Sequence, residues 1–91
     1  MAQATVLASG TTAATSTDIA VSATETKSVG MFAAGPISGG IFLTVLMDTP
    51  GADIAVGVLT PTRPVLRLSG PGTFRVSRPV TDMAVGVFTE T

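Results

Sequence analysis

The chain has 91 residues, of which 45% are hydrophobic and 12% charged, with a formal net charge of −1 at pH 7. The absence of histidine and cysteine excludes the familiar zinc sites, disulfides and Ser–His or Cys–His nucleophile systems, and the near-neutral charge gives no long-range attraction to nucleic acid or an anionic membrane. A chain of this length forms one domain, and because a small domain cannot hide so much apolar surface, we expect it to bury the surplus in an assembly.

The N-terminal residues 1–17 are rich in alanine, serine, threonine and glycine, a composition typical of a flexible segment. We expect an N-terminal extended arm that lies on a neighbouring chain. An ordinary first strand at Thr5–Leu7, followed by a surface loop, is the alternative. The segment has neither the basic start nor the continuous apolar stretch of a secretory signal.

From Asp18 onward the apolar residues alternate with a period of two, which indicates strands. Glycine and proline turns separate these strands. Short strands with such turns, and no amphipathic helical pattern, predict that residues 18–91 form an all-β domain, a small antiparallel β-sandwich or barrel. The expected strands cover residues 19–23, 27–33, 41–47, 54–59, 65–68, 73–78 and 83–89.

The strand at 41–47 is apolar on both faces, with Phe42 and Leu46 on one face and Leu43 and Val45 on the other. A strand of a one-sided antiparallel sheet would alternate with polar residues. We therefore expect either a central strand that is covered on both faces, or an outer face, with Phe42 and Leu46, that contacts another subunit. The apolar run is shorter than the roughly 18–20 residues of a membrane helix.

One segment is repeated along the chain. Residues 52–62 and 81–91 are identical at seven of eleven positions, and residues 17–26 form a looser copy. We interpret the copies as strands in equivalent positions of a sandwich, because their spacing is too irregular for a solenoid. Asp18, Asp53 and Asp82 each precede an expected strand, and we predict that they cap turns. Binding of a hard cation and catalysis are the alternatives for these carboxylates.

All four arginines fall within 16 residues that contain no acid. If residues 65–68 and 74–76 form a hairpin, Arg67 lies opposite Arg75. Two like charges opposite each other are unfavourable unless a carboxylate binds between them. We predict that Arg63, Arg67, Arg75 and Arg78 form a patch that docks on an acidic surface of a neighbour. The alternative is a solvated strand face with partners in the same chain, such as Asp48 or Glu90.

The region from Phe42 to the C-terminus resembles small structural proteins of tailed bacteriophages. The resemblance rests on the turn and strand signatures at residues 47–53, 70–79 and 84–87. It implies a virion component: a decoration or cement protein on the capsid surface, made in the host cytoplasm, that binds a major capsid protein. It also implies a homo-oligomer, with a trimer favoured.

The expected function is therefore non-enzymatic stabilisation of a phage capsid, without cofactor or metal and without binding to nucleic acid or a membrane. The expected interface comprises Phe42, Leu46 and the arginine patch. A tail- or fibre-associated module that contacts a host receptor is the alternative. The lack of tryptophan and tyrosine disfavours sugar platforms and single-stranded nucleic-acid grooves, which rely on aromatic stacking.

Overall fold

The computed structural model describes residues 3–37 and 40–90, and within them the regular structure is entirely β, as predicted. Each strand expected from residue 19 onward is present, with its ends displaced by two residues at most. The bounds are β1 Gln3–Gly10, β2 Ala14–Thr15, β3 Ile19–Val21, β4 Thr26–Phe32, β5 Leu43–Met47, β6 Ile54–Leu59, β7 Val65–Ser69, β8 Gly72–Arg78 and β9 Val85–Glu90.

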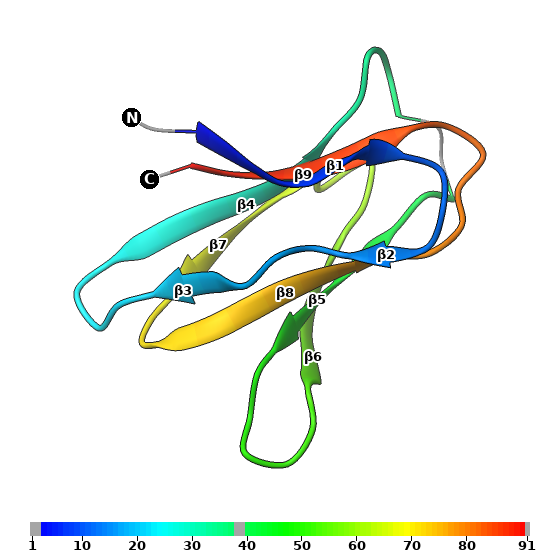
Figure 1. Cartoon of the computed structure of the whole chain (residues 1–91). Coiled ribbons are helices and arrows are strands. Elements are labelled where there is room, and N and C mark those ends of the chain that lie inside the picture. Colours follow the sequence, from blue (N-terminus) through cyan, green and yellow to red (C-terminus); the bar gives the residue numbers. More distant parts are fainter. Residues whose placement is uncertain (1–2, 38–39, 91) are drawn as a thin grey trace.

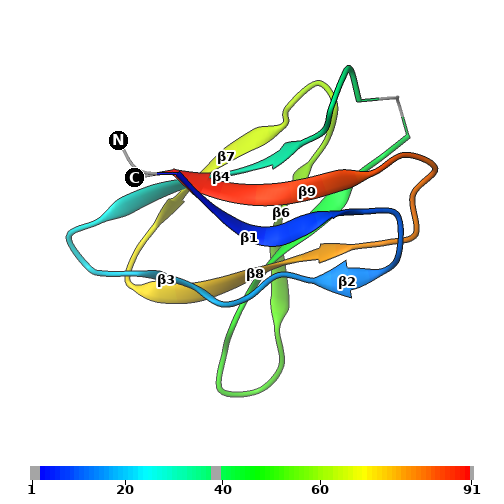
Figure 2. The ribbon, with the colours of Figure 1, turned by 45° about the horizontal axis from the view of Figure 1, so that its top comes forward.

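The strands form two antiparallel sheets that pack as a small β-sandwich (Figures 1 and 2). The first sheet has the order β1-β9-β4-β7. The second has the order β2-β8-β5-β6, and β3 also pairs with β8. Figure 1 shows the β5–β6 hairpin extending away from the body of the sandwich.

The described part of the expected N-terminal arm belongs to the sandwich. Residues 3–10 form β1, which pairs with β9 at the edge of the first sheet. Residues 14–15 form β2, which pairs with β8 in the second sheet. The alternative of an ordinary first strand therefore describes this segment better than an arm that stands apart from residues 18–91. Composition misleads here because Thr5 and Val6 favour a strand, although the alanine, serine and glycine around them are typical of a flexible segment.

The core lies between the inward faces of the two sheets. Its largest fully buried side chains come from β4 and β9 on one side and from β5, β6 and β8 on the other. Burial of each such side chain contributes about 1.5–3 kcal/mol, which makes this layer the main source of stability. These residues are Leu43, Leu59, Val29, Val45, Val76, Val85 and Val87.

The repeated segments do not occupy equivalent positions, so that interpretation is wrong. The copy at 52–62 supplies β6, an edge strand, whereas the copy at 81–91 supplies β9, which lies between β1 and β4. Val85 and Val87 are fully buried, yet the matching Val56 and Val58 are 47% and 42% exposed. An alternating strand can turn either face inward, so the sheet in which each copy pairs decides which face is buried.

Candidate interaction surface

The hairpin that would set Arg67 opposite Arg75 is not formed. Strand β7 pairs with β4 in the first sheet, while β8 pairs with β5 in the second. The chain crosses between the sheets at Gly70 and Pro71, which are joined by a cis peptide bond. Arg67 therefore lies opposite Ser28 rather than opposite Arg75. The turn residues at 69–72 fit a crossing between sheets as well as a hairpin, which is why the sequence misled.

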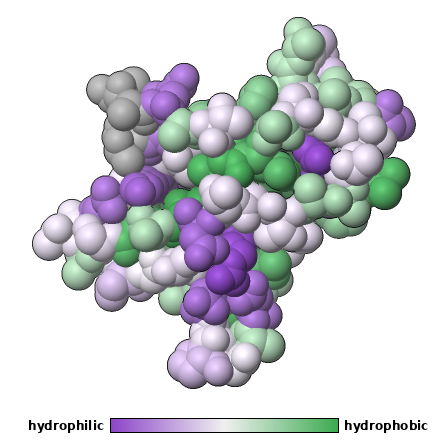
Figure 3. All heavy atoms as spheres, in the orientation of Figure 1, coloured by the Kyte–Doolittle hydropathy of each residue, from purple (hydrophilic) through white to green (hydrophobic). Residues whose placement is uncertain are grey.

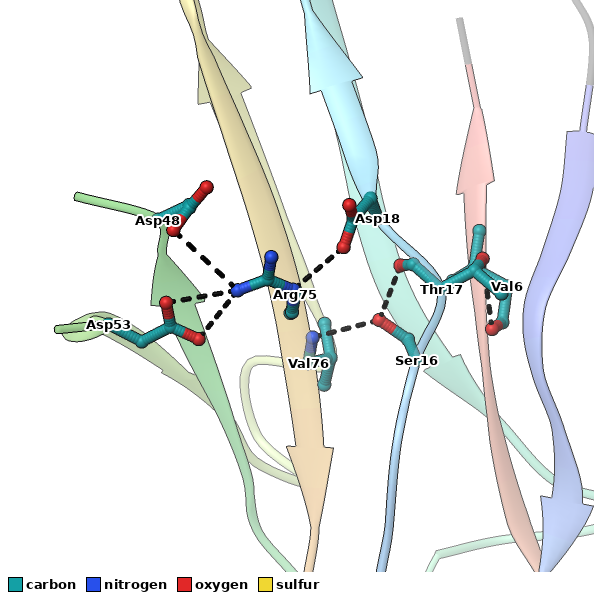
Figure 4. A network of polar contacts seen from close by, with 8 residues as sticks. All are labelled: Val6, Ser16, Thr17, Asp18, Asp48, Asp53, Arg75 and Val76. Carbon is teal, nitrogen blue, oxygen red and sulfur yellow. Dashed lines mark hydrogen bonds and ion pairs between the residues drawn. The ribbon is translucent and has the colours of Figure 1, made fainter. Parts of the chain in front are cut away.

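Arg75 instead lies at the centre of an acidic cluster on the second sheet (Figure 4). Its Nε donates to Asp18 Oδ1 at 2.7 Å, and its Nη1 donates to the two carboxylate oxygens of Asp53 at 2.9 and 2.7 Å. Asp48 Oδ1 lies 3.9 Å from Nη1. The hydrogen bonds that Arg75 donates to Asp53 and, to a lesser extent, to Asp18 raise the pKa of Arg75 above its ordinary value, so this side chain stays positively charged.

The carboxylates of Asp18 and Asp53 both come from backbone outside the regular strands. The backbone N–H of Ser16 donates to the carbonyl oxygen of Val76, and Ile19 pairs with Phe74. Between these two pairs, residues 17 and 18 therefore face a single residue of β8, Arg75. Such a bulge re-aims a side chain, and here it brings Asp18 to the guanidinium. Asp53 immediately precedes β6.

These contacts correct two expectations. Asp18 and Asp53 bind Arg75 rather than capping turns through their own backbone, and Arg75 has partners within its own chain, as the alternative interpretation held. Its described partners include Asp48, which that alternative named. Three carboxylates and one guanidinium (−3 + 1) leave the cluster with a formal charge of −2. Figure 3 shows hydrophilic residues gathered where the second sheet meets the projecting hairpin.

Arg78 is buried and serves the fold. Its side chain is 4% exposed. Nε donates to the carbonyl oxygen of Thr12 at 2.8 Å, and Nη1 donates to those of Ala8 at 2.9 Å and Val85 at 2.7 Å. Because Arg78 ends β8 and these acceptors lie on β1, β9 and the β1–β2 loop, its guanidinium ties the two sheets together. Arg63 and Arg67 remain exposed, so the four arginines do not form one surface patch.

The outer face of β5 carries the apolar side chains that the sequence predicted. Leu43 and Val45 point into the core, while Phe42 is 51% exposed and Leu46 is half-buried. The strand is therefore central in its sheet but covered on one face only. Phe42 and the exposed Val80 line a depression of about 300 Å³ at this end of the sheet. These two residues are called the Phe42 corner below.

A second group of exposed apolar residues belongs to β6. Ile54, Val56 and Val58 are each exposed by two-fifths or more. Their strand pairs with β5 along one side and is the last strand of the second sheet. Ile54, Val56 and Val58 are called the β6 edge below. The alternating valines of β6 were visible in the sequence as a strand pattern. That pattern did not show that they face outward, because the matching valines in β9 point into the core.

The outer face of the first sheet carries two phenylalanines, each paired with a glycine. Gly30 lies opposite Phe88 and Gly86 opposite Phe32, and the two ring centroids are 6.2 Å apart in an edge-to-face arrangement. A Cβ added to Gly86 would come within 2.6 Å of the Phe32 ring, so the glycines provide the space that the rings occupy. Beside the rings, Gln3, Ala4 and Thr5 complete a depression of about 500 Å³.

The residues that the structure describes include no group of three or more His, Cys, Asp and Glu side chains that could hold a metal ion, and no helix long and apolar enough to cross a membrane. Comparison of the chain with protein-family models, with curated proteins and with solved structures finds no significant match.

Proposed function

We propose that this chain is a non-enzymatic structural subunit of a phage particle, which binds the capsid surface as a homo-oligomer and stabilises the shell. The observation that carries the proposal is the exposure of two groups of large apolar side chains, the β6 edge and the Phe42 corner. Large patches of exposed apolar residues mark interaction sites, whereas single exposed apolar residues are ordinary. Two such groups suit a subunit that contacts both its own copies and an unlike neighbour.

The energetic reason is the cost of leaving these side chains in water. Complete burial of a valine, isoleucine or phenylalanine is worth about 1.5–3 kcal/mol, so covering a half-exposed one gains about half of that. Phe42 is 51% exposed and Val80 is 77% exposed. A capsid surface that covers the Phe42 corner would gain this free energy. Because the chain would then bind only the assembled shell, it would shift the equilibrium of the capsid towards assembly by mass action.

The phage setting rests on the resemblance at residues 47–53, 70–79 and 84–87. In the fold these segments are the turn of the β5–β6 hairpin, the crossing between the sheets with β8, and the start of β9. The first of them adjoins the β6 edge. The resemblance thus includes one of the segments that border the exposed apolar groups.

The decisive experiment counts copies of the chain in purified phage particles by quantitative mass spectrometry. We expect a copy number comparable to that of the major capsid protein. A handful of copies per particle would favour the tail or fibre module that contacts a host receptor, and absence from the particles would refute the proposal.

A reconstitution assay assigns the capsid contact to one surface. Phe42→Ser should lower the amount of protein that binds to particles stripped of it. Val65→Ser is the matched control, because Val65 is 46% exposed but lies on β7 of the first sheet. Equal binding of both variants would exclude the Phe42 corner as the capsid contact.

A further inference from the structure

We propose that a second copy of this chain pairs with β6 in antiparallel orientation, so that a two-fold dimer joins two second sheets into one continuous sheet. The inference deepens the proposed function, since it names the contact through which like subunits associate. The symmetry is isologous, so the β6 edge of one copy meets the β6 edge of the other.

The first argument is the composition of the strand. Natural proteins protect open sheet edges with charged or polar side chains, proline or irregular pairing. Among the edge strands that the structure describes, β1 has polar residues and two register shifts, and β7 carries Arg67 and Ser69. Strands β2 and β3, on the other edge of the second sheet, have only two and three residues, and short edges are protected by their length. Strand β6 consists of Ile-Ala-Val-Gly-Val-Leu, without one polar side chain. Its one protective feature is a register shift, which leaves Val56 unpaired with β5 and 47% exposed.

The second argument is the fate of the same sequence elsewhere in the fold. In β9 the matching valines, Val85 and Val87, are fully buried between the sheets. In β3 the matching Ile19 and Val21 are each 3% exposed. The copy in β6 is therefore the one whose branched side chains still lack cover, and a partner strand on its open side would supply part of it.

The third argument is charge. The acidic cluster, with its formal charge of −2, lies at the start of β6 through Asp53. At the other end Arg63 is exposed and is held beside Thr60 by two backbone hydrogen bonds of 3.1 and 3.0 Å. Antiparallel pairing places the acidic end of one copy next to the Arg63 end of the other, twice per dimer. Parallel pairing would bring like charges together, which is unfavourable.

The expected interface is small. A six-residue strand and its flanks bury an area near the lower limit for specific complexes, about 1,200 Å² in total. We therefore expect a dimer with a dissociation constant in the micromolar range, which dilution separates into monomers. Such a contact is strengthened when many copies are held on one shell.

Sedimentation equilibrium of the full chain from about 1 μM to about 1 mM tests the pairing. We expect a monomer–dimer equilibrium. The double variant Val56→Lys and Val58→Lys should raise the dissociation constant at least about tenfold, because two-fold symmetry sets each new charge near its copy. The matched control, Val65→Lys with Ala84→Lys, adds the same charge at exposed sites outside β6 and outside the Phe42 corner, and should change the dissociation constant less than about twofold.

Amide hydrogen exchange of the unmodified chain locates the contact without any variant. Amides of residues 54–59 should exchange more slowly at high than at low protein concentration, while those of β1 should not change. A monomer at the highest concentration, a trimer, equal weakening by both double variants, or protection that falls outside β6 would each overturn the inference. A monomer in solution with many copies per particle would refute the pairing alone, whereas absence from particles would refute the virion role alone.

Discussion

The repeated segment provides an internal test of which strand face is buried. Val87 in β9 and Val58 in β6 occupy the same position of the two copies, but Val87 is 0% exposed and Val58 is 42% exposed. Replacing either by alanine removes the same atoms from the same local sequence. Any difference in the free energy of unfolding between the two variants therefore reports the tertiary environment.

The expected magnitudes follow from burial. Val→Ala removes the equivalent of two methylene groups, worth about 1.6 kcal/mol at a fully buried site, and the cavity adds to this. We expect Val87→Ala to cost about 2 kcal/mol or more. Val58 is buried by little more than half and borders solvent, so no closed cavity forms, and we expect Val58→Ala to cost about 1 kcal/mol or less.

Urea unfolding at low micromolar concentration measures both costs on the monomer. A difference of 1 kcal/mol corresponds to about 4–8 °C in melting temperature for a domain of this size, which thermal unfolding resolves. Equal costs would refute the assignment of inward and outward faces to β9 and β6. At high protein concentration the cost of Val58→Ala should rise, because a dimer through β6 stabilises the folded state.

Four further variants test the packing and the polar contacts. Gly86→Ala should destabilise the fold by about 1–3 kcal/mol, because the added Cβ would lie 2.8 Å from the backbone oxygen of Leu7. Gly57→Ala should cost less, because the added Cβ would meet only the end of the flexible Leu66 side chain. Arg78→Met should lower the free energy of unfolding in urea by about 3–5 kcal/mol, because three carbonyl groups lose a charged donor. A loss no larger than that of a typical surface substitution would contradict the role of Arg78 in joining the sheets. Arg75→Gln should lower the melting temperature at low ionic strength, because it leaves three carboxylates uncompensated. Added salt should reduce the difference in melting temperature between this variant and the unmodified chain. A difference in melting temperature that does not depend on salt would argue against an electrostatic cause.

The candidate interface was predictable in part. Alternation along residues 41–47 placed Phe42 and Leu46 on one face of β5 and Leu43 on the other, because side chains of a strand alternate between faces. The acidic cluster around Arg75 was not predictable. Asp18 and Asp53 reach Arg75 across 57 and 22 residues of sequence, and one bulge in the backbone brings Asp18 to it. No local pattern records either contact.

The sequence by itself determined that this chain is built from short antiparallel strands, since branched residues with a period of two between glycine and proline turns favour extended backbone over helix. Only the tertiary structure decided which sheet each strand joins and which face it buries. A turn such as 69–72 connects strands within one sheet or between two, and an alternating strand fits the core with either face. Pairing between distant strands makes that choice, so the valines that close the core in β9 face solvent in β6.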